Sequence, residues 1–290
     1  MSTIRSVDHL VLPVASLASA RERWTSLGFT VAPDARHPFG TGNCCVFFEN
    51  RTYLEPLAVV DRAAAEQAES EDVLFVSRAA GYVARRGEGF AMLALRSEDA
   101  AADHAAFVGA GVSRGSNFRF SRKAVLPDGK EREIGVILAF AVDEQAPDAT
   151  FFACQHLAAG VLWRPEYVAH PNGARGIVAV SAVASSPADF HILAEAVTGQ
   201  RELRVTSFEI EAEMAGATFT IFSPLGFRAH FGVEAPDPGQ GLLLAGMEIE
   251  VADIDAAASF APGSIGHNRM IVVPPHPGQG AVVAFRGRSE

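Results

Sequence analysis

The pattern of hydrophobic and polar positions repeats one order of elements four times along this chain. In the first copy, an apolar run at 7–14 predicts a strand, and apolar residues at helical spacing within 16–28 predict a helix with one buried face. Two further apolar runs, 43–48 and 52–59, predict strands joined by a short polar connection. The same pattern of a strand followed by a helix begins again near residues 90, 177 and 242. Such spacing indicates internal duplication, and duplicated curved sheets enclose pockets.

Length and composition predict two domains. With 290 residues and 49% hydrophobic content, the chain can bury more than one core. A strong turn signal, His170-Pro171-Asn172-Gly173, lies between the second and third copies. We therefore expect an N-terminal domain of residues 1–170 with the first two copies and a smaller C-terminal domain of residues 171–290 with the other two. An alanine- and acid-rich run at 61–71 predicts a helix that links the first two copies.

Charge and cysteine content exclude several classes of protein. The formal net charge is -10, and the sequence has no basic stripe of the kind that binds nucleic acid. No apolar run has the length needed to span a bilayer, and residues 1–6 lack the apolar segment of a signal peptide. Three cysteines, two of them adjacent, form no disulfide framework and fit a reducing compartment. We therefore expect a cytoplasmic protein that binds neither nucleic acid nor a membrane.

Several motifs of the first copy resemble those of the vicinal oxygen chelate superfamily. The opening strand carries Val7-Asp8-His9-Leu10-Val11-Leu12, and Gly40-Thr41-Gly42-Asn43 precedes Arg51-Thr52-Tyr53-Leu54-Glu55, as in its glyoxalase-like subgroup. The resemblance implies an α+β fold of four repeated βαβββ modules, two per domain, which form curved mixed sheets around a pocket. Such modules could pair within one chain or across a homodimer.

The resemblance also implies a metal site. In metal-binding members, a His of the opening strand and a Glu of the fourth strand face inward, and His9 and Glu55 occupy these positions. Imidazole and carboxylate suit divalent Zn, Fe, Mn, Ni or Co. Because side chains alternate along a strand, we expect Tyr53 to share the face of Glu55 and Asp8 to lie opposite His9.

A third ligand is expected from the second module. Its opening strand at 90–95 has no donor where His9 would correspond, whereas its last strand ends in Cys154-Gln155-His156. His156 is the preferred third ligand, with Gln155 or Cys154 as substitutes. Two histidines and one carboxylate would leave coordination positions open for a substrate. The third and fourth modules have no such pair of donors, so the C-terminal domain is expected to support the first.

Three functions remain open at this point. We expect a metal-dependent lyase or isomerase that acts on a small oxygen-rich molecule, with Glu55 or a metal-bound water as the catalytic base. An extradiol-type dioxygenase needs a similar ligand set with Fe²⁺, but the later modules lack that family's usual ligands. The third alternative is a metal-free protein that binds a small molecule such as a drug, with His9 and Glu55 bonded to the ligand or to each other. Glu55 could equally pair with Arg51 or Arg36, because an unpaired buried carboxylate is costly.

Overall fold

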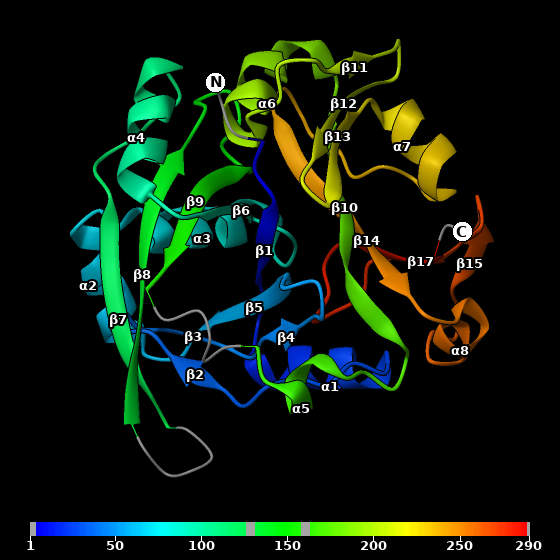
Figure 1. Cartoon of the computed structure of the whole chain (residues 1–290), viewed down its shortest axis with the longest axis horizontal. Helices are drawn as coiled ribbons and strands as arrows, with labels where there is room; N and C mark the ends of the chain where they lie inside the picture. The colour runs from blue at the N-terminus through cyan, green and yellow to red at the C-terminus, as the bar shows by residue number, and fades with distance from the viewer. Residues whose placement is uncertain (1–3, 126–130, 158–162, 289–290) are drawn as a thin grey trace.

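The two halves of the chain form two separate sheets (Figure 1). The computed structural model describes residues 4–125, 131–157 and 163–288. The N-terminal sheet, at the left of Figure 1, consists of β1 (Val7–Pro13), β2 (Ala35–Arg36), β3 (Thr41–Asn43), β4 (Val46–Phe47), β5 (Tyr53–Val59), β6 (Met92–Ser97), β7 (Phe118–Val125), β8 (Glu131–Ala141) and β9 (Thr150–His156). The C-terminal sheet consists of β10 (Ala174–Ala184), β11 (Arg204–Val205), β12 (Glu209–Met214), β13 (Ala217–Phe222), β14 (Leu242–Val251), β15 (Ile265–His267), β16 (Met270–Val273) and β17 (Val282–Gly287).

Strand order confirms the predicted fold class. The main path of the first sheet runs β2-β3-β5-β1-β6-β9-β8-β7, and that of the second runs β11-β12-β13-β10-β14-β17-β16-β15. In both sheets the opening strands of the two modules lie antiparallel at the centre, and each pairs in parallel with the last strand of its own module. The chain is therefore an α+β protein of four βαβββ modules, two in each curved mixed sheet.

The module helices are α1 (Leu17–Ser26), α4 (Ala100–Gly109), α6 (His191–Thr198) and α8 (Ile254–Ser259). The remaining helices lie between modules: α2 (Arg62–Ser70), α3 (Leu74–Arg86), α5 (Pro165–Val168) and α7 (Pro224–Phe231). The helix predicted at 61–71 is confirmed as α2, whose N-terminus is capped by the side chain of Asp61. Sequence inspection missed α3, which buries Phe75, Val76 and Tyr82 on one face.

Alternation along the strands separates the two faces of the first sheet. Leu10 and Leu54 belong to a large core that continues through both halves of the chain, whereas Val11 and Leu57 belong to a second core that α2 and α3 cover. His9 and Glu55 share the face of Val11. The same alternation that builds the shared core therefore directs these two side chains into the space on the opposite face.

The corresponding face of the second sheet is filled by α7. Phe227 and Phe231 of that helix are fully buried and pack with Val183 and Phe222 of the sheet. Thr220 of β13 occupies the position that corresponds to Glu55, because Thr220 pairs with Ser181 of β10 as Glu55 pairs with Val11 of β1. This packing agrees with the expectation that the C-terminal half lacks the pair of donors found in the first module.

The division between the sheets falls within the segment that joins β9 to β10. The backbone N–H of Gly173 donates to the carbonyl of His170 at 2.9 Å, so the expected turn is present. The large core nevertheless runs through both halves, with Phe151 of one against Phe219 of the other. Whether residues 1–170 and 171–290 behave as independent domains stays a prediction. None of the helices in the described part of the chain is long and apolar enough to cross a membrane.

His170 attaches the connection between the sheets to the N-terminal half. Its Nδ1 accepts from the backbone N–H of Thr30 at 3.0 Å, and its Nε2 lies 2.9 Å from the carbonyl of Phe47. The ring is therefore held in the neutral form with the proton on Nε2, because a proton on Nδ1 would face the N–H of Thr30. Burial lowers the pKa of His170 to about 4, although the bond to Phe47 opposes the shift.

We expect this histidine to make the protein less stable in mild acid. The unfolded chain protonates His170 as pH falls through about 6.5, whereas the folded protein resists until about 4, so protons favour unfolding between these values. The free energy of unfolding should fall by at most about 3 kcal/mol across this range. Denaturant unfolding at several pH values should show a shallower dependence in His170→Gln, and the exposed His276→Gln should behave as wild type. Equal pH dependence in all three proteins would contradict the prediction.

Candidate functional site

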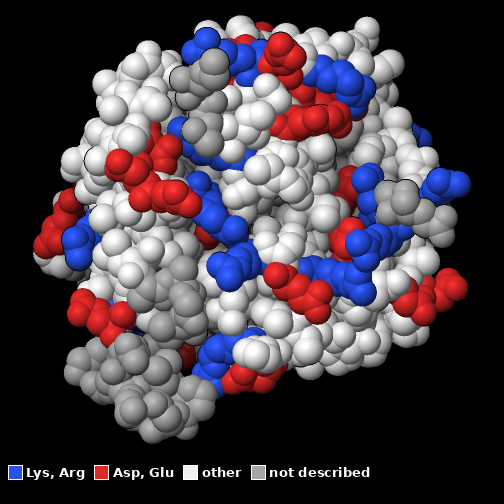
Figure 2. Space-filling view, in the orientation of Figure 1, with Lys and Arg blue, Asp and Glu red and all other residues white. Residues whose placement is uncertain are grey.

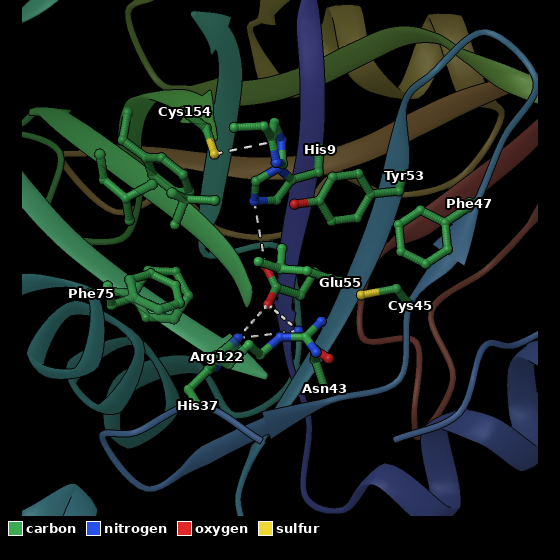
Figure 3. Close-up of a pocket in the computed structure, with 16 residues that line it drawn as sticks. His9, His37, Asn43, Cys45, Phe47, Tyr53, Glu55, Phe75, Arg122 and Cys154 are labelled. Atoms are coloured by element: carbon green, nitrogen blue, oxygen red, sulfur yellow. Dashed lines mark hydrogen bonds and ion pairs between the residues drawn. The ribbon is translucent and has the colours of Figure 1, made fainter. Parts of the chain in front are cut away.

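A pocket lies on the face of the N-terminal sheet that carries His9 and Glu55 (Figure 3). Its cavity volume is about 60 Å³, which is room for a few waters or part of a small ligand. Its wall combines polar, aromatic and aliphatic side chains from β1, β3, β4, β5, β7, β8, β9 and α3. The lining residues are His9, His37, Asn43, Cys45, Phe47, Tyr53, Glu55, Phe75, Phe120, Arg122, Ile134, Val136, Leu138, Phe152, Cys154 and His156.

The structure brings His9 and Glu55 together in this pocket. His9 Nε2 lies 3.4 Å from Glu55 Oε2, and the two side chains are 3% and 7% exposed. The ring of Tyr53 stacks on the imidazole of His9 at a centroid distance of 4.2 Å, so Tyr53 does share the face of Glu55. The alternative partners Arg51 and Arg36 make no contact with Glu55 among the ion pairs of the described residues.

The expectation that Asp8 lies opposite His9 is wrong for its carboxylate. Asp8 Oδ1 lies 2.7 Å from His9 Nδ1, and the Asp8 side chain is fully buried. The pairing of β1 with β6 shifts register between Val7 and His9, and this irregularity breaks the simple alternation at Asp8. Asp8 therefore orients the imidazole of His9 from the nitrogen that faces away from Glu55.

His37 is a pocket residue that sequence inspection did not select. It lies in the turn between β2 and β3, and its Nε2 is 3.6 Å from Glu55 Oε1. Asn43 also donates from Nδ2 to that oxygen at 2.7 Å, while Thr41 Oγ1 holds His37 Nδ1 at 2.8 Å. The two oxygens of Glu55 thus face the Nε2 atoms of two histidines, one from β1 and one from the turn.

His156 lines the same pocket, and its contacts are with Asp8 and Cys154. Its Nε2 lies 3.0 Å from Asp8 Oδ1 and 3.7 Å from Cys154 Sγ. Among the described residues, Asp8, Cys154 and His156 form a group of metal donors within 4.8 Å of one another, whereas His9, Glu55 and His156 do not. His156 as the third ligand of His9 and Glu55 therefore stays a prediction. Gln155 faces away and binds the carbonyl of Glu98 at 2.8 Å.

Strand register identifies what replaces the ligands in the second module. His9 pairs with Ala94, and Val11 pairs with Met92. A local twofold axis through the Leu10–Leu93 pair between them exchanges His9 with Met92. Phe152 takes the place of Glu55, because it pairs with Ala94 as Glu55 pairs with Val11. Neither Met92 nor Phe152 is a metal donor, although Arg122, Cys154 and His156 of the second module also line the pocket.

The charged groups of the pocket hold one another in their ionised forms. Burial alone would raise the pKa of a carboxyl group and lower that of an imidazole. The pKa of Asp8 is nevertheless held well below its usual range, because burial is outweighed by His156 and His9. Burial of His9 is likewise outweighed by its bonds to Asp8 and Glu55, which raise the pKa of His9 to about 9. The pKa of Glu55 is lowered despite burial, chiefly by His9.

His37 differs from His9 in its protonation. Burial lowers the pKa of His37, and although Glu55 opposes this shift, the cations Arg122 and His9 add to it. Since Asn43 Nδ2 lies 3.3 Å from His37 Nε2, the ring presents a lone pair on that nitrogen and its proton on Nδ1. His37 is therefore a neutral imidazole whose free nitrogen points toward Glu55.

His9 and Glu55 have the spacing of two ligands of a divalent metal ion, whereas the donor atoms of His9, Glu55 and His37 do not all lie within 4.8 Å of one another. Bonds of about 2.0 to 2.2 Å to nitrogen and oxygen hold neighbouring ligand atoms about 3.0 to 3.5 Å apart. His9 Nε2 and Glu55 Oε2 meet that requirement at 3.4 Å. The Nε2 of His9 faces a carboxylate, so either a proton or a cation must lie between them. The bond from His9 Nδ1 to Asp8 supplies the carboxylate that metal-binding histidines usually have behind them.

Comparison with known proteins identifies the family and the fold. The family model of the glyoxalase-like domain matches residues 7–198. A hypothetical protein from Staphylococcus aureus aligns with a TM-score of 0.71 and 12% identity, over 98% of this chain and 100% of that one. A Mn(II)-bound glyoxalase from Novosphingobium aromaticivorans aligns with a TM-score of 0.56 and 11% identity, over 100% and 84%. A triple mutant of 4-hydroxymandelate synthase from Streptomyces coelicolor aligns with a TM-score of 0.56 and 14% identity, over 99% and 95%.

Identities this low show a shared fold and no more. No curated protein matches the sequence.

Proposed function

This chain belongs to the glyoxalase-like domain family of the vicinal oxygen chelate superfamily, and we propose that it is a metal-dependent lyase or isomerase acting on a small oxygen-rich molecule. One observation carries the proposal: the two oxygens of the Glu55 carboxylate face the Nε2 atoms of His9 and His37 inside a largely apolar pocket. Two imidazoles and one carboxylate form the ligand set that leaves positions open for a substrate.

His9 and Glu55 are the primary ligands in this proposal, and His37 is the third. A divalent cation held there would polarise neighbouring oxygens of a bound molecule and stabilise the negative charge that develops on them. Asp8 keeps His9 in the tautomer whose Nε2 faces the ion. His37 needs no proton loss to bind a metal, because its Nε2 is already unprotonated.

Glu55 also serves as the proton acceptor. It is the carboxylate among the described residues that line the pocket, and its lowered pKa keeps it ionised. Phe75, Phe120 and Phe152 surround the polar groups and limit the access of water, which strengthens every electrostatic interaction inside. Arg122 of β7 is half-buried in the same wall and provides a positive charge for an anionic part of the substrate.

An oxygen-dependent reaction is the second candidate. The same set of two histidines and one carboxylate suits non-haem Fe²⁺, and the fold is shared with a 4-hydroxymandelate synthase. A metal-free binding protein is the third candidate, since the protonated His9 already neutralises part of the charge on Asp8 and Glu55. Metal content and metal identity distinguish all three.

The first experiment is therefore the metal content of protein purified without chelator, followed by titration with Mn²⁺, Zn²⁺, Ni²⁺ and Fe²⁺. We expect close to one first-row metal ion at this site in wild type and loss of it in His9→Ala and Glu55→Ala. His37→Ala and His156→Ala separate the two candidates for the third ligand. Loss of affinity by more than about tenfold is expected for His37→Ala and a smaller change for His156→Ala.

If His156→Ala instead weakens metal binding more than His37→Ala does, His156 is the third ligand. Wild-type protein that neither contains nor takes up a metal would contradict the enzyme proposal and favour the metal-free binding protein. Specific uptake of Fe²⁺ together with oxygen consumption in the presence of phenolic acids would favour the dioxygenase.

A further inference from the structure

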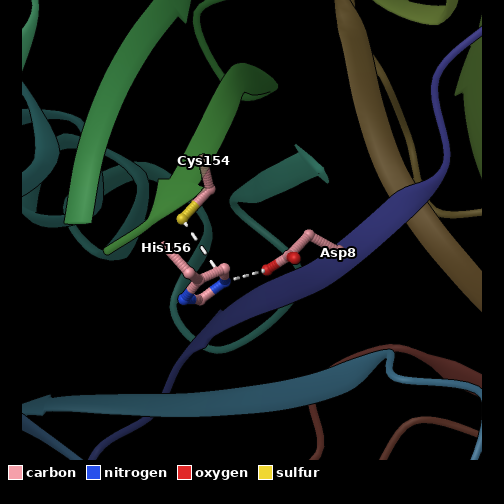
Figure 4. Close-up of side chains that lie close together, drawn as sticks. All are labelled: Asp8, Cys154 and His156. Carbon is pink, nitrogen blue, oxygen red and sulfur yellow. Dashed lines mark hydrogen bonds and ion pairs between the residues drawn. The ribbon is translucent and has the colours of Figure 1, made fainter. Parts of the chain in front are cut away.

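A second group of donors consists of Asp8 of β1 with Cys154 and His156 of β9 (Figure 4). Asp8 Oδ1, Cys154 Sγ and His156 Nε2 all lie within 4.8 Å of one another. Asp8 and Cys154 are buried, and the side chain of His156 is 7% exposed. The group therefore combines one carboxylate, one thiol and one imidazole in a site that is almost closed to solvent.

The geometry of this group excludes a nucleophilic triad. In a triad, one imidazole nitrogen contacts the thiol and the other contacts the carboxylate. Here Cys154 and Asp8 both contact His156 Nε2, at 3.7 and 3.0 Å. The Nδ1 atom of His156 is buried with no hydrogen-bond partner among the described residues. Three donor atoms therefore lie within 4.8 Å of one another, close enough for one metal ion to contact all three.

The separations of the donor atoms match a small cation. Tetrahedral Zn²⁺ with bonds of about 2.0 Å to nitrogen and about 2.3 Å to sulfur holds those atoms about 3.5 Å apart. The observed distance between His156 Nε2 and Cys154 Sγ is 3.7 Å. A carboxylate oxygen at about 2.0 Å requires about 2.9 to 3.4 Å to the nitrogen, and Asp8 Oδ1 lies at 3.0 Å.

A divalent ion at this point would displace the proton of Cys154, because burial and the carboxylates of Asp8 and Glu55 raise the pKa of that thiol well above its usual range. A thiolate and a carboxylate together carry two negative charges, which one divalent cation neutralises inside a buried site. Arg96 Nε lies 3.5 Å from Asp8 Oδ2, so it compensates the other oxygen of Asp8 and leaves Oδ1 facing His156. Sulfur and imidazole donors select Zn²⁺, Co²⁺ or Cd²⁺ over Mg²⁺ or Ca²⁺.

We propose that Asp8, Cys154 and His156 form a second metal site, specific for thiophilic divalent cations and separate from the site of His9 and Glu55. The proposal does not rest on the function proposed above, because it uses none of His9, Glu55 and His37, although Cys154 and His156 line the same pocket. Asp8 joins the two sites, since its Oδ1 also lies 2.7 Å from His9 Nδ1. A metal bound by Asp8 and Cys154 therefore lies directly behind the imidazole that binds the first metal.

Cobalt titration of the full-length, metal-free protein in a phosphine reductant tests the proposal. Co²⁺ bound to a thiolate gives a near-ultraviolet charge-transfer band, which nitrogen and oxygen ligands do not give. We expect this band to saturate at one equivalent of thiolate-bound cobalt in wild type. Cys154→Ser should abolish it, and His156→Ala should weaken the corresponding affinity by at least about tenfold. Cys154→Ala provides a second variant should the serine substitution perturb folding, which circular dichroism reports.

The two other cysteines supply matched controls. Cys44 and Cys45 are both buried, and Cys45 even lines the same pocket, so Cys44→Ser and Cys45→Ser should keep the band. Glu55→Gln should also keep the charge-transfer band, while the total amount of bound cobalt falls by one equivalent. Loss of metal from the site of His9 and Glu55 can therefore be distinguished from loss of metal at the second site. Absence of the band in wild type, or its survival in both Cys154 variants, would overturn the proposal. Loss of the band in Glu55→Gln would equally overturn it, because Cys154 would then belong to the first site.

Discussion

Glu55→Gln is expected to weaken binding of a divalent metal in the pocket by at least about 100-fold, more than the loss of a second-shell group costs. Glutamine keeps the shape of the side chain and an oxygen for the amide of Asn43, but it carries no charge. The metal would then bind to neutral ligands alone, in a buried site where the negative charge of a carboxylate offsets much of the cost of desolvating the ion. Isothermal titration with Mn²⁺ and Zn²⁺ measures the loss.

Glu248→Gln is the matched control for this variant. Glu248 is 2% exposed and lies on the C-terminal sheet, where it contacts His230 at 2.6 Å and Arg286 at 2.7 Å. Its removal also deletes a buried, paired carboxylate, so any general effect of charge loss on folding appears in both variants. Metal affinity should change only in Glu55→Gln. Equal affinity in wild type and Glu55→Gln would show that the carboxylate is no ligand.

The repeated modules could be predicted because each one repeats the same alternation and three of the four repeat a side-chain cap on the helix. Ser16, Asp99 and Asp253 each accept hydrogen bonds from the first turn of a module helix. His9 and Glu55 were proposed from the family resemblance, and alternation along β5 correctly placed Tyr53 on the face of Glu55. Local periodicity therefore predicted the face of a side chain where the backbone is regular, but it did not identify the ligands.

Irregular backbone explains what could not be predicted. Asp8 lies at a register shift, so the period of two fails there. His37 lies in a turn, where no periodicity indicates the direction of a side chain. Gly40 closes that turn with φ +84°, and a Cβ there would come within 2.4 Å of the backbone nitrogen of Ala65 in α2. The position of His37 thus depends on tertiary contact with α2.

The same limit applies to His156. Its place at the end of β9 could be read from the sequence, but its partner depends on how far β9 lies from β5 across the sheet. Two strands, β1 and β6, separate β9 from β5, so Asp8 on β1 is the nearer acceptor. Strand order is a property of the whole sheet, and it cannot be predicted from the sequence of a single strand.

Trp24→Ala is expected to lower the free energy of unfolding by about 3 to 5 kcal/mol. Trp24 belongs to α1 of the first module and is fully buried in the core shared by both halves. Its indole Nε1 donates to the carbonyl of Gly278 at 3.1 Å, and the neighbouring Arg23 donates to Gln279 at 2.7 Å. The substitution therefore removes a large apolar side chain at the contact between the N-terminal and C-terminal halves.

Two further variants separate packing from the hydrogen bond. Trp24→Phe keeps most of the apolar volume and should cost about 1 to 2 kcal/mol, whereas Glu22→Ala, on the exposed side of the same helix, should stay within about 0.5 kcal/mol of wild type. In the Trp24 variants the fluorescence comes from Trp163 alone, while far-ultraviolet circular dichroism reports both sheets. Coincident transitions are expected, because a continuous core couples the halves. Two separated transitions would show instead that residues 1–170 and 171–290 fold as independent domains. A loss of unfolding free energy below about 1 kcal/mol in Trp24→Ala would contradict the expected contribution of Trp24 to the shared core.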